Sequence, residues 1–470
     1  MAAVTRMVVI GGNATGMAAA SQARRLKGPD ELEIVVAERG DVTSYSSCGI
    51  PYWIAGDVTG EAALVVRTPQ QHRERGIDVR TGTEAVALDA EARRVCLRPT
   101  GEPGTAGEWL PYDHLVLATG ARPTRPPLPG IDAPGVHGVQ TLDDGRALLH
   151  ALERAETGAP GGARRRAVVV GAGYIGVEMS EALVRRGYQV TVLDQSEQPM
   201  TTLDPDMGAL VHEAMDAMGI DTRTGTAVTA IHTDADGHVR AVATDDAEFP
   251  AEIVILGLGV QPETTLARDA GLPLGESGGL LTDQALRVRG HETLWAGGDC
   301  VEVLDLVGGR NQHIALGTHA NKHGQIIGTN IGGDYATFPG VVGTAVSKVC
   351  DLEIARTGLL ERQAAALGLR YVTVTVESTS RAGYYPGAAP MHVKMIAEHR
   401  TGRLLGTQIV GREGAGKRVD IAAVALTARM TVEQLIALDL GYAPPFSPVW
   451  DPVLAAARKA VKAVREASED

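Results

Sequence analysis

The 470-residue sequence is poor in cysteine and in aromatic residues, and it has no long apolar run. Its four cysteines, Cys48, Cys96, Cys300 and Cys350, are too few and too scattered for a disulfide framework or a CxxC zinc site, so no metal site is expected. No apolar stretch approaches the ~18 residues of a membrane span, and the run Met7–Ile10 stops at two glycines instead of continuing as a signal peptide. These absences predict a cytoplasmic protein that does not enter a membrane.

Basic residues are outnumbered as well, with 44 lysines and arginines against 57 aspartates and glutamates and a formal net charge of −13. An acidic chain binds nucleic acid and anionic membranes poorly, so neither partner is expected. Glycine, by contrast, is abundant at 57 residues, and 44% of the chain is apolar. This glycine content without a collagen repeat is typical of a globular α/β enzyme with many tight turns, and the length allows about three domains.

The N-terminal segment has the order of a dinucleotide-binding unit. The β-run Met7–Ile10 enters a glycine turn that starts at Gly11, a helix of small residues follows, and the next β-run ends at Glu38. An acid at this place accepts hydrogen bonds from a ribose. Asn13 occupies the middle glycine position, so the prediction depends on the strand, helix and acid around it.

The same order recurs later in the chain. Gly171, Gly173 and Gly176 complete the motif GxGxxG between a β-run and a helix. Glycine at these positions lets the backbone approach a pyrophosphate at the helix N-terminus. The following β-run ends at Asp194, and Gln195 beside it offers no arginine for a 2′-phosphate. The second unit is therefore predicted to bind NADH in preference to NADPH.

Cys48 follows the first unit in the segment Ser44–Tyr52, where Pro51 suits the first turn of a helix. A thiol at a helix N-terminus has its thiolate stabilised by unpaired N–H groups, so the pKa of Cys48 is expected to fall below its usual value. Cys48 is thus the candidate redox nucleophile. The other three cysteines have no such setting and are predicted to be structural.

In its order of motifs the chain resembles the pyridine nucleotide-disulfide oxidoreductases over essentially its whole length. The order runs from the first glycine unit through the Cys48 segment, Ala118-Thr119-Gly120 and the second glycine unit to the segment TLWAGGD at 293–299. Members that resemble glutathione reductase carry a second cysteine five residues after the first, where this chain has Trp53. The resemblance therefore points to the single-cysteine branch, which contains coenzyme A-disulfide reductase, NADH oxidase, NADH peroxidase and persulfide reductases. Peroxide chemistry loses support, because NADH peroxidase and many of the oxidases carry a histidine in the first glycine turn and this chain has none there.

The resemblance implies an α/β fold with two Rossmann-like dinucleotide-binding domains, for FAD and NAD, and a C-terminal α+β dimerisation domain. We expect the FAD domain at residues 1–150 and 275–335, the NAD(P)H domain at 151–274 and the dimerisation domain at 336–470, with a surface link at Gly158–Arg166. Alternating runs at Tyr371–Val376, His392–Ile396 and Leu404–Val410 favour an antiparallel sheet in the last domain. The cofactor-binding residues that we expect are Gly11, Gly12, Asn13, Ala14, Gly16, Glu38, Arg39, Val86, Thr119, Gly120, Gly171, Gly173, Tyr174, Ile175, Gly176, Asp194, Gly259, Asp299 and Ala315.

Two C-terminal motifs, GYYPG at 383–387 and YAPP at 442–445, are similar to those of coenzyme A-disulfide reductases. The resemblance implies that Tyr384, Tyr385 and Tyr442 reach the cysteine of the partner subunit in a homodimer and protonate or orient the leaving thiol. It places substrate contacts at Gln22, Arg25, Ser44, Ser47 and His319, with Arg25 suited to hold a phosphate. Ser47 replaces an asparagine of the family pattern, and Trp450 stands where a lysine can help to bind coenzyme A.

These residues predict an FAD-dependent NAD(P)H oxidoreductase that reduces coenzyme A disulfide, or a related small disulfide, through the single cysteine Cys48. The same residues are compatible with an NADH oxidase in which Cys48 cycles through a sulfenic acid, and with a persulfide or polysulfide reductase. A flavin redox sensor without turnover is the alternative outside enzymes. Two complete dinucleotide units argue against a sensor, because a sensor needs no dedicated hydride supply.

Overall fold

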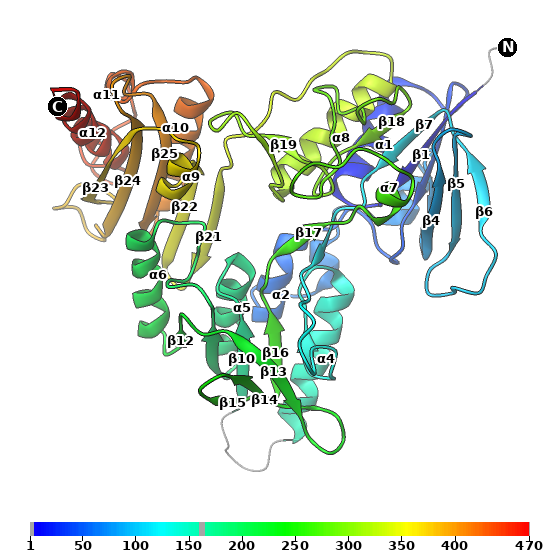
Figure 1. Ribbon diagram of the computed structural model, residues 1–470, viewed down its shortest axis with the longest axis horizontal. Coiled ribbons are helices and arrows are strands. Elements are labelled where there is room, and N and C mark those ends of the chain that lie inside the picture. The colour runs from blue at the N-terminus through cyan, green and yellow to red at the C-terminus, as the bar shows by residue number, and fades with distance from the viewer. Residues whose placement is uncertain (1–3, 159–164, 470) are drawn as a thin grey trace.

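The computed structural model describes residues 4–158 and 165–469. Figure 1 shows three units, with the N-terminal unit at one end, the C-terminal unit at the other and a second α/β unit below and between them. The first unit is built on a five-stranded parallel sheet in the order β18-β7-β1-β2-β3. Its strands are β1 (Thr5–Ile10), β2 (Leu32–Ala37), β3 (Asp78–Arg80), β7 (His114–Leu117) and β18 (Leu294–Ala296).

The first sheet is buried on both faces, which explains the continuous apolar runs of its strands. Val8 and Val9 of β1 point to opposite faces and neither is exposed. Helices α1 (Ala14–Leu26) and α8 (Gly317–Ile331) pack against each other beside this sheet. They approach closely because α8 presents glycines to α1: a Cβ on Gly328 would lie 2.5 Å from the carbonyl oxygen of Ala19.

The second unit repeats this plan. Its parallel sheet has the order β12-β11-β10-β16-β9, and a three-stranded antiparallel sheet accompanies it as one does in the first unit. The second sheet consists of β9 (Val136–His137), β10 (Arg166–Val170), β11 (Gln189–Leu193), β12 (Asp221–Arg223) and β16 (Ile253–Leu256), and its helices are α4 (Leu142–Gly158), α5 (Tyr174–Arg185) and α6 (Pro205–Ala217). The small sheets are β4 (Thr83–Asp89), β5 (Arg94–Pro99) and β6 (Glu108–Pro111), and β13 (Val228–Thr233), β14 (Val239–Thr244) and β15 (Glu248–Pro250).

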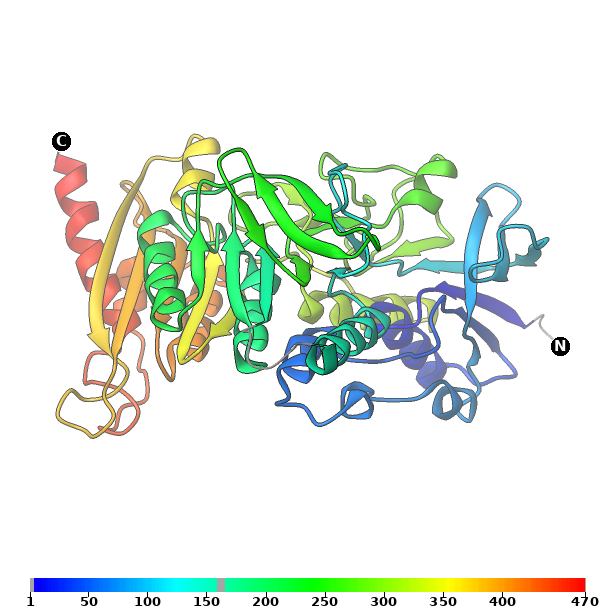
Figure 2. The ribbon, with the colours of Figure 1, turned by 90° about the horizontal axis from the view of Figure 1, so that it is seen from below.

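Short elements connect these units and carry the Cys48 segment. β8 (Ala121–Pro123) and β17 (Val260–Pro262) form a two-stranded antiparallel crossing between the first and second units. The Cys48 segment forms the 3-10 turn η1 (Ser47–Gly49) and then α2 (Ile50–Ala55), which lies against α4 and α5 (Figure 2). The remaining short elements are η2 (Glu61–Leu64), α3 (Pro69–Arg73), β19 (Val303–Leu304), β20 (Asn311–Gln312) and α7 (Thr265–Asp269).

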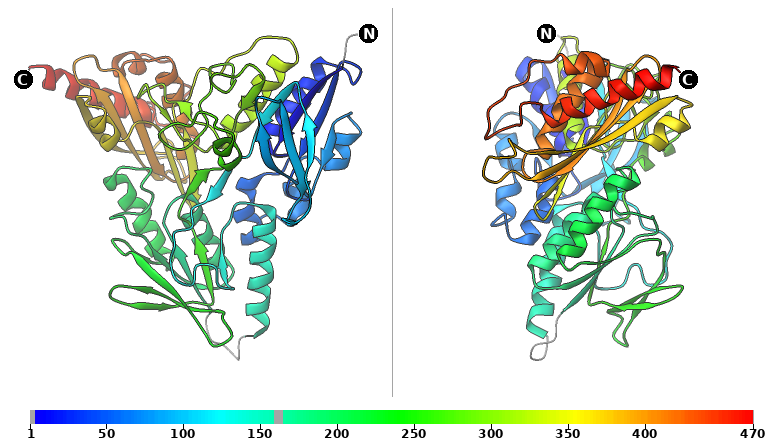
Figure 3. Two further views of the ribbon diagram at one scale, coloured as in Figure 1. Left: turned by 45° about the vertical axis from the view of Figure 1, so that its right-hand side comes forward. Right: turned by 90° about the vertical axis from the view of Figure 1, so that its left-hand side faces the viewer.

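The C-terminal unit is an antiparallel sheet in the order β21-β22-β25-β24-β23, which confirms the predicted antiparallel pairing. One face packs against α10 and α12, and the other faces α5 and α6 of the second unit (Figure 3). Neighbouring residues accordingly enter different cores, Ile409 with the helices and Val410 with the second unit. The elements are β21 (Ala345–Val349), β22 (Leu352–Gly358), β23 (Tyr371–Thr379), β24 (Pro390–Glu398), β25 (Leu404–Gly411), α9 (Glu361–Ala366), α10 (Ala415–Thr427), α11 (Val432–Ile436) and α12 (Pro452–Glu469).

The first and second units each contain strands from separate parts of the chain, so the domain boundaries given above remain predictions. β18 and α8 join the first unit, in agreement with the assignment of 275–335 to it. β9 pairs with β16, so the second sheet takes a strand from before residue 151. Of the predicted link Gly158–Arg166, Gly158 ends α4 and Arg166 begins β10, and residues 159–164 lie outside the described residues.

A cluster of charges around the buried Lys394 joins the second unit to the C-terminal unit. Lys394 of β24 is 5% exposed, and its Nζ lies 2.6 Å from Asp206, 3.4 Å from Asp204 and 2.5 Å from Glu361. Asp204 also accepts a 2.6 Å hydrogen bond from the side-chain amide of Gln408. This network links the two units, because Lys394 and Gln408 of the C-terminal unit pair with Asp204 and Asp206, which precede and begin α6 of the second unit. Among the residues that the structure describes, no helix has the length and apolarity to cross a bilayer.

Candidate active site

The two glycine turns have the same geometry. Gly11 and Gly171 both adopt positive φ, +106° and +96°, and a Cβ on either would lie within 2.5 Å of a backbone oxygen of the neighbouring strand end. A Cβ on Gly16 or Gly176 would lie 1.9 Å from the carbonyl oxygen of the first glycine of its turn. The turns therefore require glycine at both places, because only glycine lets the helix start so close to the strand.

The acid that ends the second strand of each unit is held in place by backbone N–H groups. Glu38 accepts hydrogen bonds from Gly12 at 2.6 Å and from Gly40 at 2.8 Å. Asp194 accepts them from Ala172 at 2.5 Å and from Ser196 at 2.7 Å. Each carboxylate is thus fixed beside its own glycine turn, where a ribose hydroxyl would meet it.

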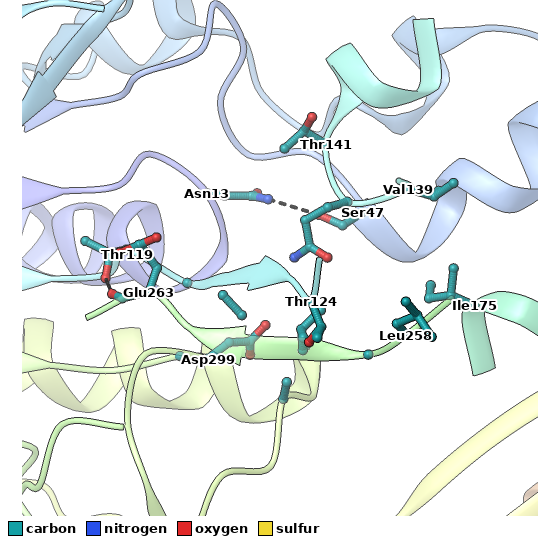
Figure 4. A pocket seen from close by; sticks show the side chains of 18 of the residues that line it. Asn13, Ser47, Thr119, Thr124, Val139, Thr141, Ile175, Leu258, Glu263 and Asp299 are labelled. Carbon is teal, nitrogen blue, oxygen red and sulfur yellow. Dashed lines mark hydrogen bonds between the residues drawn. The ribbon is translucent and has the colours of Figure 1, made fainter. Parts of the chain in front are cut away.

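Both turns open into one cavity of about 1540 Å³. Figure 4 shows Asn13 and Ser47 from the first unit, Ile175 from the second and Asp299 after β18 around this space. Three predicted cofactor residues, Gly12, Gly16 and Gly176, lie within the turns and not on the wall. The predicted residues on the wall are Gly11, Asn13, Ala14, Glu38, Arg39, Val86, Thr119, Gly120, Gly171, Gly173, Tyr174, Ile175, Asp194, Gly259, Asp299 and Ala315, together with Ser47 and Cys48.

Asn13 explains why the first turn departs from the glycine motif. Its Oδ1 accepts from the N–H of Tyr45 at 3.1 Å, and its Nδ2 lies 3.4 Å from the Oγ of Ser47 (Figure 4). The side chain that replaces the middle glycine therefore ties the first turn to the segment that carries Cys48. Ser47, the residue before Cys48, is held at the same time.

Cys48 is a free thiol exposed to the cavity, and Tyr52 and Glu178 line the wall with it. Trp53, at the position of the second cysteine in dithiol relatives, packs against the core, and its ring lies 2.8 Å from the place of a Cβ on Gly145. Cys96 and Cys300 are buried, and Cys350 is half-buried with its Sγ 2.8 Å from the Sδ of Met218. One accessible thiol therefore faces the cavity that the two turns share.

The predicted lowering of the Cys48 pKa is wrong. Burial raises the pKa of the Cys48 thiol, and the charges of Glu178 and Asp299 raise it further. The helix behind the thiol is the short α2, whose first turn begins two residues later, so its dipole is weak at Cys48. Loss of solvation and two nearby carboxylates therefore outweigh the helix terminus.

Ser44 precedes Cys48 by four residues and has a buried partner that the sequence did not indicate. Its Oγ lies 2.9 Å from the Nε2 of His72, which is 1% exposed. Burial lowers the pKa of His72 to about 4, and Arg67 and Arg75 lower it in the same direction. The imidazole is therefore neutral at pH 7, and Ser44, which has a positive φ of 51°, keeps an uncharged buried partner.

The other predicted substrate residues lie outside the cavity wall. Gln22 and Arg25 form a pair on α1, where Arg25 donates to Gln22 at 3.2 Å and Gln22 donates to Thr329 of α8. His319 is 8% exposed on α8, and Trp450 stands under the guanidinium of Arg458 in the C-terminal unit. Within one chain these side chains do not assemble around Cys48.

Tyr384 and Tyr385 lie on the loop between β23 and β24, Tyr442 lies on the loop that leads into α12, and none of them lines the cavity of their own chain. Tyr384 and Tyr442 are 79% and 48% exposed. Burial raises the pKa of Tyr442, and a side-chain hydrogen bond with Tyr384 raises it further. The structure thus brings the tyrosines to each other and not to Cys48 of the same chain.

Comparison with known proteins identifies the family. Residues 5–324 match the family described as pyridine nucleotide-disulphide oxidoreductase, and residues 344–452 match its dimerisation domain. The chain belongs to the pyridine nucleotide-disulphide oxidoreductase family. Membership confirms the predicted fold, the flavin-dependent oxidoreductase class and the cofactors FAD and a pyridine nucleotide. The matched dimerisation domain supports a dimer.

Three relatives of this oxidoreductase are similar along nearly the whole chain. It is 35% identical over 454 residues to an NAD(P)H sulfur oxidoreductase (CoA-dependent) of Pyrococcus furiosus, covering 96% of this chain and 98% of that protein. It is 35% identical over 459 residues to an NADH oxidase of Methanocaldococcus jannaschii, covering 97% and 99%. An NAD-dependent persulfide reductase from A. fulgidus has a similar structure, with a TM-score of 0.92, 38% identity and coverage of 98% and 84%.

The residues of this oxidoreductase fit both cofactors. A pocket for one small molecule usually has about 300–1,000 Å³, so a cavity of about 1540 Å³ has room for two nucleotides. If Gly173 carried a Cβ, only one atom, the carbonyl oxygen of Gly257, would lie within 4 Å of it. The backbone beside the first turn of α5 is therefore open to a pyrophosphate. The carboxylates of Glu38 and Asp194, each held by backbone N–H groups, would offer one ribose partner in each unit.

Sequence reasoning missed Glu178 of α5, which lines the same cavity as Cys48 and whose charge acts on its thiol. Its Oε1 accepts a 2.9 Å hydrogen bond from Ser347 of β21, and burial raises the pKa of Glu178. It also missed Tyr52, whose pKa burial and Glu178 raise to about 12. The acid seven residues after Gly171 is a local signal, but its approach to Cys48 depends on how the first and second units pack.

Replacing Glu178 with glutamine is expected to let the Cys48 thiolate form at lower pH. A negative neighbour favours the neutral thiol, so removing its charge lowers the thiol pKa. The measurement is the pH dependence of Cys48 alkylation by iodoacetamide. Glu181→Gln, one turn further along α5, is the control, since the charge of Glu181 acts on Tyr52 instead. A Glu178→Gln curve that overlays the wild type contradicts the assignment.

Proposed function

We propose that this oxidoreductase reduces coenzyme A disulfide, or a closely related small disulfide, with electrons from NADH. The observation that carries the proposal is the position of Cys48, a single accessible thiol on the wall of the cavity into which both glycine turns open. The Pyrococcus furiosus relative, described as a CoA-dependent sulfur oxidoreductase, supports a coenzyme A-type substrate.

The turn at Gly11–Gly16 with Glu38 would hold FAD, and the turn at Gly171–Gly176 with Asp194 would hold NADH. When bound, the flavin supplies a two-electron connection between the nicotinamide and a sulfur at Cys48. The residues of the chain fix the thiol: Asn13 holds Ser47, and His72 holds Ser44. Trp53 leaves Cys48 without a resolving cysteine, so the partner sulfur must come from the substrate.

The thiolate of Cys48 attacks one sulfur of the disulfide, the substrate S–S bond breaks, and a mixed disulfide forms on Cys48 as the first thiolate leaves. Two electrons then reduce the mixed disulfide and release the second thiol, so one NADH and one proton yield two thiols. The leaving thiolates need a proton. Tyr384, Tyr385 and Tyr442 of a second copy of the chain would donate it, in a homodimer whose sites are completed across the interface.

The test is anaerobic NADH consumption with coenzyme A disulfide, compared with glutathione disulfide, cystine and a persulfide. Release of two thiols for each NADH, fastest with coenzyme A disulfide, supports the proposal. Fastest turnover of the persulfide assigns the chain a role like that of the A. fulgidus relative. NADH consumption only in an aerobic sample without disulfide assigns an oxidase, as in the Methanocaldococcus jannaschii relative.

The carboxylate of Asp194 predicts a preference for NADH. An acid fixed beside the glycine turn repels the 2′-phosphate of NADPH, so kcat/KM for NADH should exceed that for NADPH by about tenfold or more, which corresponds to ~1.4 kcal/mol. Asp194→Ser should reduce the ratio of kcat/KM for NADH to kcat/KM for NADPH, mainly by raising kcat/KM for NADPH. Equal kcat/KM values in the wild type, or an unchanged ratio in Asp194→Ser, contradict this role.

A further inference from the structure

The guanidinium of Arg418 on α10 contacts four residues of the C-terminal unit. Its Nε lies 3.0 Å from Asp451 Oδ2, and its Nη2 donates to the carbonyl oxygens of Ser380 at 2.9 Å and Phe446 at 2.7 Å. Its Nη1 donates to Gly414 at 3.2 Å. The side chains of Arg418 and Asp451 are each 10% exposed, so the cluster is nearly removed from solvent.

Ser380 and Phe446 belong to the two loops that carry the predicted tyrosines. The first tyrosine loop, residues 380–389, joins β23 to β24, and the second, residues 441–450, leads into α12. The backbone N–H of Ala382 donates to the carbonyl of Pro444 at 3.1 Å, which links the loops directly. Nη2 of Arg418 bridges the same two loops from beneath, so its position sets the distance between them.

Asp451 extends this connection to the last helix. Its Oδ1 accepts from the N–H of Val453 in the first turn of α12, and its Oδ2 accepts from the hydroxyl of Ser447 at 3.3 Å. The second tyrosine loop is therefore anchored at its far end by the carboxylate that pairs with Arg418. A buried carboxylate needs this partner, since an unpaired charge at such a place is costly.

The bases of the loops are buried and their tips are not. Phe446 is 76% and Tyr384 is 79% exposed, and the tyrosine at each tip contacts the other through its side chain. A long exposed loop keeps one conformation only if its base is fixed. Ser380 and Asp451, at the two bases, are 4% and 8% exposed.

We propose that Arg418 is a positioning residue that holds the two tyrosine loops as one unit for presentation to the thiol site of a second copy of the chain. The inference rests on the proposed function, because it concerns the proton donors of that reaction. Arg418 itself touches neither the cavity nor Cys48 in its own chain. A planar fork with five donors suits this place, whereas the single ammonium of lysine can reach only part of the four acceptors.

The experiment compares Arg418→Lys with the control Lys417→Gln in the FAD-loaded dimer. Lys417 is the neighbouring residue on α10, has an 86% exposed side chain and pairs with Asp420. Three quantities are measured: the rate of flavin reduction by NADH, kcat/KM for the disulfide, and amide hydrogen exchange of the peptides that cover both tyrosine loops. Tyr442→Phe is added in the wild-type and Arg418→Lys backgrounds.

In Arg418→Lys, the backbone amides of both tyrosine loops are expected to exchange faster than in the wild type. The rate of flavin reduction by NADH should stay at the wild-type value, whereas kcat/KM for the disulfide should fall about tenfold or more. Tyr442→Phe should then add little to the loss in the Arg418→Lys background, because both changes remove the same proton donor. Lys417→Gln should match the wild type in all three quantities.

Faster loop exchange with unchanged disulfide turnover overturns the proposal, since the loops would then move without consequence for the reaction. Wild-type exchange rates of the loop amides in Arg418→Lys also overturn the proposal, because Arg418 would then not hold the two loops in place. The proposed function fails separately, if the wild-type enzyme releases thiol from no disulfide. The exchange result stands in that case, since it needs no substrate.

Discussion

Cys48→Ser is expected to lose at least ~10³-fold in disulfide reduction, because a hydroxyl neither attacks a disulfide nor forms a mixed disulfide. The variant should still fold and bind FAD, since the thiol faces the cavity and is not packed in a core. It should also still accept electrons from NADH, because Asn13 ties the first turn to this segment through Tyr45 and Ser47 and not through the Cys48 thiol. Thiol release and anaerobic flavin bleaching, recorded on the same sample, separate the two half-reactions.

Cys350→Ser is the matched control for this variant. Cys350 is another free cysteine with partial exposure, but it lies between β21 and β22 against Met218. Its replacement should leave disulfide turnover within about twofold of the wild type. Full disulfide reduction by Cys48→Ser, or an equal loss in Cys350→Ser, would move the nucleophile elsewhere.

Gly176→Ala is expected to raise KM for NADH about 100-fold and to leave the flavin content of the purified enzyme unchanged. The added Cβ would lie 1.9 Å from the carbonyl oxygen of Gly171, so the first turn of α5 must move away from β10. That turn presents the N–H groups that would meet the pyrophosphate. The measurement is steady-state KM for NADH, together with the flavin absorbance per protein.

Gly16→Ala provides the complementary variant in the first unit, where the Cβ would lie at the same 1.9 Å from the Gly11 carbonyl. This variant should bind FAD more weakly, so the flavin content of the purified enzyme should fall. Gly104→Ala is the neutral control, because no atom lies within 4 Å of its Cβ. Loss of flavin from Gly176→Ala, or an unchanged KM for NADH, would contradict the assignment of the two units.

The features that sequence reasoning predicted are those encoded within one segment. The strand, glycine turn, helix and acid of each unit are consecutive, and steric limits at Gly11 and Gly171 determine the residues there. The antiparallel C-terminal sheet was predictable for the same reason, since alternation with period two is a local pattern. The short strand β9 was not, because its two residues give no pattern.

The site features that escaped prediction arise where separate segments meet. His72 reaches Ser44 from α3, and Glu178 reaches the Cys48 wall from another unit, without any motif that joins them. The Cys48 pKa was predicted with the wrong direction for this reason. The helix after Cys48 was visible in the sequence, whereas the burial and the two carboxylates that outweigh it come from packing.

The position of β18 also determines the order in which the units can be completed during synthesis. All five strands of the second sheet lie between Val136 and Leu256, whereas the first sheet needs Leu294–Ala296 beside β7. A nascent chain leaves the ribosome from its N-terminus, and domains generally fold as units. The second unit therefore has every strand available while the first still lacks its edge strand, so the unit that begins the chain is the later of the two to be complete.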